Sequence, residues 1–218
     1  VNNKGSFPLD YSTWTRNYNQ KDLDEIYNRS MDTTFKRITL RMDSQPLQMG
    51  GQHRLSFKTF ASQREFENLN RDDYYFSGRI LRTSSTIQHP VKTNNYGFSL
   101  SDQIQWNDVF SSRAGIRYDY TKMTPQQLNA ECHACDKTPP AANTYKGWSG
   151  FVGLAAQLSQ TWRLGYDVTS GFRVPNASEV YFTYNHGSGT WLPNPNLKAE
   201  RSTTHTLSLQ GRSEKGTL

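Results

Sequence analysis

The chain has 218 residues, a net charge of +6 and a mean hydropathy of −0.83. Its 25 Lys and Arg residues are scattered, and the lack of a clustered basic run argues against nucleic-acid binding. Aromatic residues make up 13% of a chain that is only 34% hydrophobic, which argues against disorder and favours half-apolar strands joined by polar loops. The sequence contains no run of 18 apolar residues, so we expect no transmembrane helix.

Apolar and polar residues alternate with period 2 in successive segments, the pattern typical of β-strands. The clearest alternating segments are FKRITLRM (35–42), NNYGFSLSDQIQW (94–106), SSRAGIRYDYT (111–121), WSGFVGLAAQL (148–158) and WRLGYDVT (162–169). One face of each is aliphatic and aromatic, with Asp102 as the exception, and the other carries Arg, Asp, Ser, Thr, Gln and Gly. Runs of about ten residues exceed the usual soluble strand and match a tilted strand that crosses a bilayer.

The connections between these segments alternate strictly in length. The short turns are 43–51, 107–109, 159–161 and 212–217, and the long loops are 1–32, 64–93, 122–146 and 172–200. Short periplasmic turns opposite long extracellular loops are typical of outer-membrane barrels. Trp106, Trp148 and Trp162 lie near strand ends, where aromatic side chains form interfacial girdles.

The sequence therefore predicts an all-β fold, the middle portion of a transmembrane antiparallel β-barrel. We expect about seven strands and the start of an eighth, with long extracellular loops. Bacterial barrels have an even number of strands, starting from about eight, so seven strands leave open edges that must pair with further strands. Residues 1–218 are accordingly expected to be a fragment, part of a single larger barrel domain.

Five arginines fall on the polar face that would line the lumen: Arg37, Arg41, Arg113, Arg117 and Arg163. They can pair with acidic residues in a hydrated wall, or they can form a basic lining that favours anionic substrates. The sequence leaves both interpretations open.

The motif ECHACDK places Cys132 and Cys135 in the third long loop. We expect a loop disulfide, because the cell exterior is oxidising. A metal site or a redox site could use the same cysteines, but only His133 could join the two thiolates, whereas a closed zinc site needs about four ligands. A redox C-x-x-C also expects a neighbouring helix, which the alternation does not predict.

The loop 172–200 gathers aromatic residues around one histidine, His186, which glycines flank at 187 and 189. A neutral imidazole is a common iron ligand, and flat apolar surfaces suit a porphyrin. Tyr181 and Tyr184 are rival iron ligands, and an inert exposed histidine is the simpler interpretation. We expect solvated or interfacial positions for the remaining histidines, His53, His89, His133 and His205.

No catalytic constellation or nucleotide-binding motif is present, so we expect no enzyme and no catalytic cofactor. The composition is also compatible with a soluble β-rich binding module and with a barrel-type outer-membrane enzyme.

The same loop resembles the haem-binding box of TonB-dependent haem and haemoglobin receptors, in which an FRAP motif, a loop histidine and NPNL follow one another. The matching residues are Phe172, Arg173 and Pro175, then His186, then Asn194, Pro195, Asn196 and Leu197. Val174 departs from the pattern, where Ala is usual. The resemblance extends along all 218 residues and is greatest to the TonB-dependent subunits of bipartite haemoglobin–haptoglobin utilisation receptors, through segments such as ECHACDKTPPAANTYKGWSG and FTYNHGSGTWLPNPNLKAE.

The resemblance implies a bacterial outer-membrane barrel of about 22 strands with its loops at the cell surface. It implies a plug domain and C-terminal strands that lie outside this sequence, and TonB as the energy source acting through the missing N-terminal region. Haem is then the transported ligand, bound at His186 with Tyr181 and Tyr184, and haemoglobin and haemoglobin–haptoglobin are partners. Outer-membrane lipid is a further partner, and a surface lipoprotein is a candidate co-receptor. A receptor for another iron source, siderophore or transferrin-type iron, is the competing hypothesis.

Overall fold

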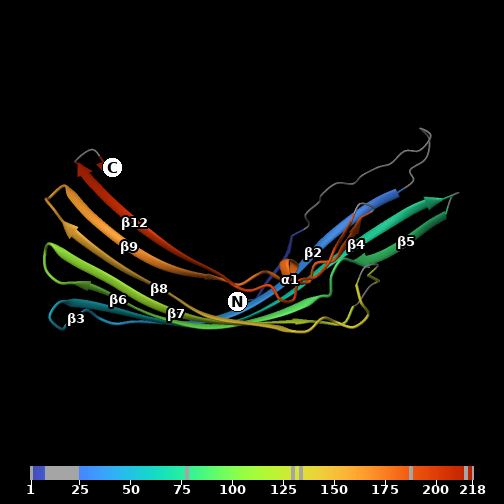
Figure 1. Cartoon of the computed structure of the whole chain (residues 1–218), viewed down its shortest axis with the longest axis horizontal. Coiled ribbons are helices and arrows are strands. Elements are labelled where there is room, and N and C mark those ends of the chain that lie inside the picture. The colour runs from blue at the N-terminus through green and yellow to red at the C-terminus, as the bar shows by residue number, and fades with distance from the viewer. Residues whose placement is uncertain are drawn as a thin grey trace.

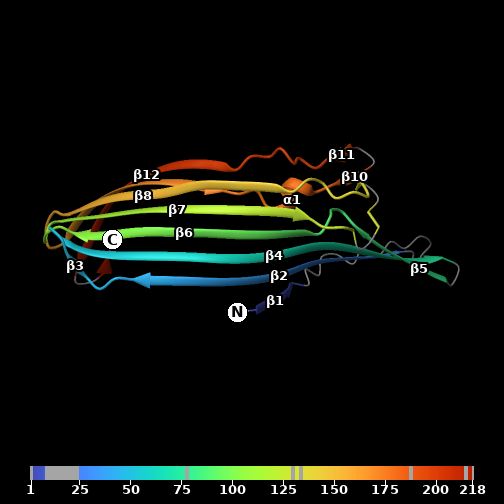
Figure 2. The same ribbon diagram turned by 90° about the horizontal axis from the view of Figure 1, so that it is seen from below.

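The computed structural model describes residues 2–7, 25–76, 79–128, 131–132, 135–186, 189–213 and 216–217. Its main feature is one antiparallel sheet that bends strongly along the strands (Figures 1 and 2). The long strands are β2 (Glu25–Asp43), β4 (Gln52–Phe76), β6 (Val91–Gln105), β7 (Phe110–Pro125), β8 (Asn143–Gln157), β9 (Trp162–Arg173) and β12 (Glu200–Ser213). These seven strands confirm the all-β antiparallel prediction and its strand count.

Short strands extend this sheet at its margins. They are β1 (Asn2–Phe7), β3 (Leu47–Gln48), β5 (Arg79–Thr86) and β13 (Gly216–Thr217). β13 pairs with the end of β12, within the segment 212–217 that the sequence predicts to be a short turn. The order β1-β2-β4-β6-β7-β8-β9-β12-β13 follows the chain, so successive long strands are neighbours, as in an up-and-down barrel.

The two ends of the sheet differ as the connection lengths predict. The turns after β2, β6 and β8 lie at one end, whereas α1 (Ala177–Tyr181), β10 (Tyr184–His186) and β11 (Gly189–Trp191) lie at the other end with β5 (Figure 2). In the first turn Gly50 has a φ of 77°, a left-handed conformation that glycine adopts without a steric penalty. None of the helices in the described part of the chain has the length and apolarity to cross a membrane.

Three of the predicted long loops contain more strand than expected. β2 already begins at Glu25, and β4 continues to Phe76 before β5 returns beside it, so much of 1–32 and 64–93 is extended. Segment 64–76 has neither Gly nor Pro, so nothing in it interrupts the ladder with β2. β7 and β8 likewise extend to Pro125 and from Asn143, into the predicted loop 122–146.

The apolar positions of the strands are exposed, as a lipid-facing surface requires. Ile38 is 73% exposed, Val152 is 55% exposed and Leu207 is 74% exposed. Trp106 and Trp162 stand beside the turns, as the girdle prediction expects, but Trp148 lies well inside β8. There its ring contacts Tyr118, with ring centroids 4.9 Å apart, so Trp148 belongs to an aromatic cluster within the sheet.

The opposite face carries aromatic rings that cover glycines across the strands. Phe60 pairs with Gly97, and a Cβ on Gly97 would approach the Phe60 ring to 2.6 Å. Phe151 covers Gly115 in the same way. Such rings replace the side-chain contacts that glycine lacks. Arg37 and Arg117 stack on the Phe60 ring, at 4.5 and 5.1 Å from its centroid.

The predicted lumen arginines are partly neutralised. Arg41, Arg113 and Arg117 form ion pairs with Asp43, Asp167 and Asp119, whereas Arg37 donates to the Thr39 hydroxyl and Arg163 to the Ser111 hydroxyl. Near the turns, Arg54, Arg113 and Arg163 line a depression of about 460 Å³. Among the residues that the structure describes, the wall therefore combines arginines that have an acidic partner with arginines that have none.

Candidate functional site in the loop between β9 and β12

The loop that carries the FRVP and NPNL motifs is clamped at both ends by one arginine. Arg173, the last residue of β9, donates from Nε to Glu200 Oε2 at 2.8 Å, where β12 begins. Its Nη1 donates to Glu179 Oε2 of α1 at 3.0 Å. The motif arginine therefore joins the strand that enters the loop, the strand that leaves it and the helix between them.

A capping box begins the short helix α1. The Asn176 side chain accepts from the Glu179 amide at 2.8 Å, and the Glu179 carboxylate accepts from the Asn176 amide at 2.7 Å. Hydrogen bonds from Arg173, and then from the Asn176 backbone, hold the pKa of Glu179 below its ordinary value of 4.5. Pro175, just before the cap, is fully buried.

A small apolar core lies beneath this helix, on the concave side of the sheet (Figure 1). Its buried members are Val91, Met123, Tyr145, Val180 and Tyr181. Phe172 and Leu197, from the two motifs, pack against it, and the Phe172 ring covers Gly147. The apolar residues of FRVP and NPNL therefore hold the loop base on the sheet.

Tyr181 is 1% exposed, and its hydroxyl donates to the Ala141 carbonyl at 3.3 Å. Burial raises the pKa of this phenol to about 12. A tyrosine that binds haem iron must present its phenol oxygen to the iron. The phenol oxygen of Tyr181 is buried and donates a hydrogen bond within the protein. Tyr181 therefore belongs to the packed base of the loop and is not available to bind haem iron in this conformation.

The NPNL motif forms a turn that returns the chain to the sheet. The Asn194 amide donates to the Val180 carbonyl at 3.0 Å, and the Asn194 side chain accepts from the Asn196 amide at 3.2 Å. The Asn143 side chain, at the start of β8, donates to the Pro195 carbonyl at 2.6 Å. This motif thus fixes the backbone and contributes no side-chain charge.

His186 lies at the tip of the loop, in the hairpin formed by β10 and β11. His186 pairs with Gly189, and Tyr184 pairs with Trp191. The side chains of Tyr184 and His186 lie outside the described residues, so the structure gives their backbone positions only. Trp191 is 59% exposed and the adjacent Leu192 is 75% exposed. The tip therefore presents apolar surface, whereas the base is packed.

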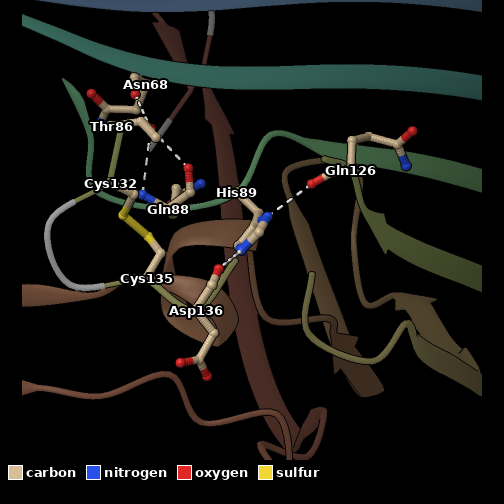
Figure 3. Close-up of a disulfide and its surroundings, with 8 residues drawn as sticks. All are labelled: Asn68, Thr86, Gln88, His89, Gln126, Cys132, Cys135 and Asp136. Atoms are coloured by element: carbon tan, nitrogen blue, oxygen red, sulfur yellow. Dashed lines mark hydrogen bonds between the residues drawn. A yellow bond between two sulfur atoms is a disulfide. The ribbon is translucent and has the colours of Figure 1, made fainter. Parts of the chain in front are cut away.

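A neighbouring segment, 86–90, ties this loop to the third long loop (Figure 3). The Thr183 amide donates to the Ile87 carbonyl at 3.0 Å. His89 is 3% exposed, with Nδ1 2.8 Å from the Gln126 carbonyl oxygen and Nε2 3.0 Å from that of Asp136. The solvated position expected for His89 is therefore wrong, because backbone carbonyls of the adjacent loop enclose its ring.

Cys132 and Cys135 are joined in a disulfide beside this segment, with Cα atoms 5.2 Å apart (Figure 3). His133, between them, lies outside the described residues. Among the side chains that the structure describes, no group of three or more His, Cys, Asp or Glu residues could hold a metal ion.

Comparison with known proteins assigns the chain to a family. A family described as "TonB dependent receptor-like, beta-barrel" matches residues 2–218. The chain belongs to this family. TonB-dependent receptors are outer-membrane transport receptors and are not a class of enzymes.

The curated relatives of this TonB-dependent receptor chain are named for haemoglobin. "Probable hemoglobin and hemoglobin-haptoglobin-binding protein 4" of Haemophilus influenzae is 24% identical over 95% of the chain and 26% of its own length. "Hemoglobin-haptoglobin utilization protein B" of Neisseria meningitidis is 24% identical over 95% of the chain and 28% of its own length. "Hemoglobin-binding protein A" of Haemophilus influenzae is 23% identical over 91% of the chain and 23% of its own length. The chain thus spans about a quarter of the length of each of these three relatives.

Sequence reasoning missed several residues that build the receptor loop. Glu179 and Glu200 complete the Arg173 clamp, and Asn143 holds the NPNL turn from another strand. The spacing N-x-x-E at 176–179 is a capping-box signature and could have indicated α1. The role of Asn143 depends on a contact across 52 residues, for which the sequence has no local sign.

His53 is a second histidine whose surroundings the sequence did not predict. It is 9% exposed, and its Nδ1 lies 2.6 Å from Oδ2 of Asp102, an acidic residue on the apolar face of β6. Trp106 meets its ring edge to face, with centroids 6.0 Å apart. The pair explains how the apolar face accommodates Asp102, because the acid gains a hydrogen-bonding partner.

Proposed function

We propose that this chain is part of an outer-membrane receptor that binds haemoglobin or haemoglobin–haptoglobin, extracts haem and imports it with energy supplied through TonB. The observation that carries the proposal is the loop between β9 and β12, whose motifs hold a packed base beneath an exposed hairpin with His186 at its tip. The names of the relatives, which match nearly the whole chain, point to the same ligand.

In this proposal the loops at the α1 end of the sheet face the cell surface, and residues 1–218 contribute part of one larger barrel domain. The hairpin presents His186 to the haem iron, with Tyr184 as the second candidate ligand. Trp191, 59% exposed, supplies a flat apolar surface for the porphyrin. A rigid base lowers the entropic cost of holding these groups in place.

Arginines of the inner wall are candidates to attract haem after its release from the donor protein. Haem carries two carboxylates, and cations that lack an acidic partner attract them. Among the described residues, Arg37 and Arg163 form no ion pair: each donates a hydrogen bond to a hydroxyl group, and Arg37 also stacks on an aromatic ring. They are the candidates for guiding an anionic ligand along the wall. Arg113 instead pairs with Asp167 of β9, and Arg117 pairs with Asp119 of its own strand.

Growth on defined iron sources tests the proposal. A strain that lacks the full-length receptor gene and carries it on a plasmid receives haemoglobin, haemoglobin–haptoglobin, free haem, transferrin or a ferric siderophore as its sole iron source. We expect the gene to restore growth on haemoglobin or its haptoglobin complex, and growth to require TonB. Restored growth on the siderophore or transferrin alone would contradict the proposal and favour a receptor for another iron source.

The need for a surface lipoprotein is tested in the same strain. Deleting candidate lipoprotein genes one at a time, with the receptor present, shows whether haemoglobin-dependent growth requires a partner. Docking of labelled haemoglobin to intact cells separates loss of donor binding from loss of transport.

A further inference from the structure

The depression of about 460 Å³ near the turns lies on the inner face of the sheet, and its floor consists of small residues. In one row of paired residues, Ala155 of β8 stands between Ser111 and Gly165. Gly153 lies in the next row of the same strand face. A Cβ on Gly153 would approach Cγ of Arg113 to 2.9 Å, so the packing leaves no room for a larger side chain there.

Two arginines extend across this floor to partners on the strand beyond β8. Arg113 of β7 reaches over β8 to β9, where its Nη2 lies 2.9 Å from Oδ1 of Asp167. In the opposite direction, Arg163 of β9 donates from Nη2 to the Ser111 hydroxyl of β7 at 3.2 Å. Both contacts cross β8 where its inward residues are glycine and alanine. The small floor therefore brings two guanidinium groups together in the depression.

Arg54 of β4 supplies a third cation. It is exposed, and in the paired row Gln103 stands between Arg54 and Arg113. Within the described residues, Arg54 makes no ion pair. The described residues that line the depression include three arginines and one acidic residue, Asp167, so the lining has an excess of positive charge. Glutamine amides complete the polar lining: Gln52, Gln103, Gln105 and Gln210.

The other described acidic residues at this end of the sheet do not line the depression. Asp43 accepts a hydrogen bond from Arg41 at 2.8 Å. Asp102 lies on the outer face beside His53, and Asp108 lies in the turn after β6. The positive charge therefore remains for an anionic ligand. Guanidinium groups and side-chain amides donate hydrogen bonds, and a carboxylate accepts them from both of its oxygens.

We propose that this depression is a second site for the transported ligand, in which Arg54 and Arg163 hold a carboxylate of haem before haem leaves the barrel. The inference rests on the proposed function for the identity of the ligand and for the direction of transport. With the loops at the cell surface, the turn end of the sheet is the end at which haem leaves. A ligand in transit has to dissociate again, and exposed arginines bind an anion weakly enough to allow this.

An acidic side chain from a part of the receptor beyond these residues has the same carboxylate chemistry as haem. Import of haem and of haem dimethyl ester separates the two sources, because methylation removes both negative charges from the porphyrin. Cells that carry the full-length receptor receive either porphyrin labelled with radioactive iron. The measured quantity is the initial rate of TonB-dependent uptake, and the ratio of the haem rate to the ester rate reports recognition of the carboxylates.

The test variant is Arg54→Gln/Arg163→Gln, which removes the two lining arginines that have no acidic partner among the described residues. Arg54→Lys/Arg163→Lys keeps both charges at the same positions. The control, Lys58→Gln/Lys137→Gln, removes the same charge from a position on β4 that does not line the depression and from a loop. Surface expression and haemoglobin docking are measured for every variant, so that a failure of folding is distinguished from a loss of transport.

We expect the ratio of haem import to ester import to fall about tenfold in the glutamine variant, because each exposed charge pair contributes a modest part of the binding free energy. The lysine variant should keep most of the ratio, since an ammonium group retains the charge but loses the two-pronged contact of a guanidinium group. The control variant should have the ratio of the wild type.

An unchanged ratio in the glutamine variant would overturn the proposal. If both rates also stay at the wild-type level, the arginines have no part in transport, and if both fall equally, they bind an acidic side chain of the receptor. An equal fall of the ratio in the control would overturn it as well, because a diffuse basic wall would then replace a discrete site. A wild type that imports neither porphyrin contradicts the proposed function itself, whereas a wild type that imports haem beside an unaffected glutamine variant contradicts only this site.

Discussion

The base and the tip of the loop between β9 and β12 are built in opposite ways. At the base, one arginine joins two carboxylates, a capping box starts α1, and Tyr181 and Val180 are completely buried. At the tip, a hairpin of short strands exposes Trp191 and Leu192. The recognisable motifs, FRVP and NPNL, belong entirely to the base. These motifs therefore mark the support of the loop, while the proposed haem-binding groups lie between them.

The largest effect on the base should come from Tyr181→Ala. Removing this buried ring costs about 3–5 kcal/mol in a packed core. Amide hydrogen exchange of residues 177–197 in the full-length receptor should then accelerate. Tyr181→Phe keeps the ring and loses only one hydrogen bond, so it should cost about 1 kcal/mol or less. Equal acceleration by both variants would mean that the hydroxyl, and not the packing, fixes the loop.

Removing the disulfide beside segment 86–90 should destabilise the protein less than Tyr181→Ala does. Opening a ring this short costs about 2 kcal/mol in the chain-entropy account of disulfide stabilisation. In Cys132→Ser/Cys135→Ser, limited proteolysis should cut the third long loop faster than in the wild type. Reducing the wild type with dithiothreitol should reproduce the result, and cleavage that is insensitive to both treatments would show that His89 and its carbonyl partners hold the loop alone.

Asn176→Ala tests the capping box. The loss of an N-cap costs about 1 kcal/mol, so the amides of α1 should exchange several-fold faster. Asn176→Asp retains an acceptor and should exchange as the wild type does. Faster exchange at the hairpin as well would show that base and tip are coupled more tightly than their separate contacts suggest.

The ion pairs of Arg173 should have the smallest effect, because they are exposed to water. The pKa of Glu179 in the folded state lies below its ordinary value of 4.5. The stability that ionised Glu179 adds to the fold is therefore complete above pH 4.5 and is lost as the pH falls through the lowered pKa. Hydrogen exchange of α1, corrected for intrinsic rates, should accelerate in that acidic range. In Arg173→Gln this acid-induced change should be much reduced, and an identical pH profile would remove the clamp from the account.

The alternation of side chains was enough to predict the seven strands, the short turns and the exposed apolar face. It could not predict how far β2 and β4 extend, because their loop-end halves have no regular alternation of apolar and polar residues and pair with each other. Nor could it show that Phe60 covers Gly97, since this depends on the register between strands. The buried positions of His53 and His89 depend on partners 49 and 37 residues away.

The candidate site was predicted less completely than the fold. The motif residues were identified, but their resemblance to a haem-binding box gave no reason to separate support from ligand contact. Tyr181 and Tyr184 are equivalent in the sequence, two tyrosines on either side of a Phe-Thr pair. They differ because α1 turns Tyr181 into the core, whereas Tyr184 follows the helix and enters the hairpin.

Haem titration of the full-length receptor, followed by its Soret absorbance, tests the division between base and tip most directly. The variants to compare are His186→Ala at the tip and Tyr181→Phe at the base, each with surface expression and haemoglobin docking measured in parallel. The account predicts that His186→Ala loses the Soret shift while Tyr181→Phe retains it, with docking intact in both. Unchanged haem binding in His186→Ala, or its loss in Tyr181→Phe, would contradict the account.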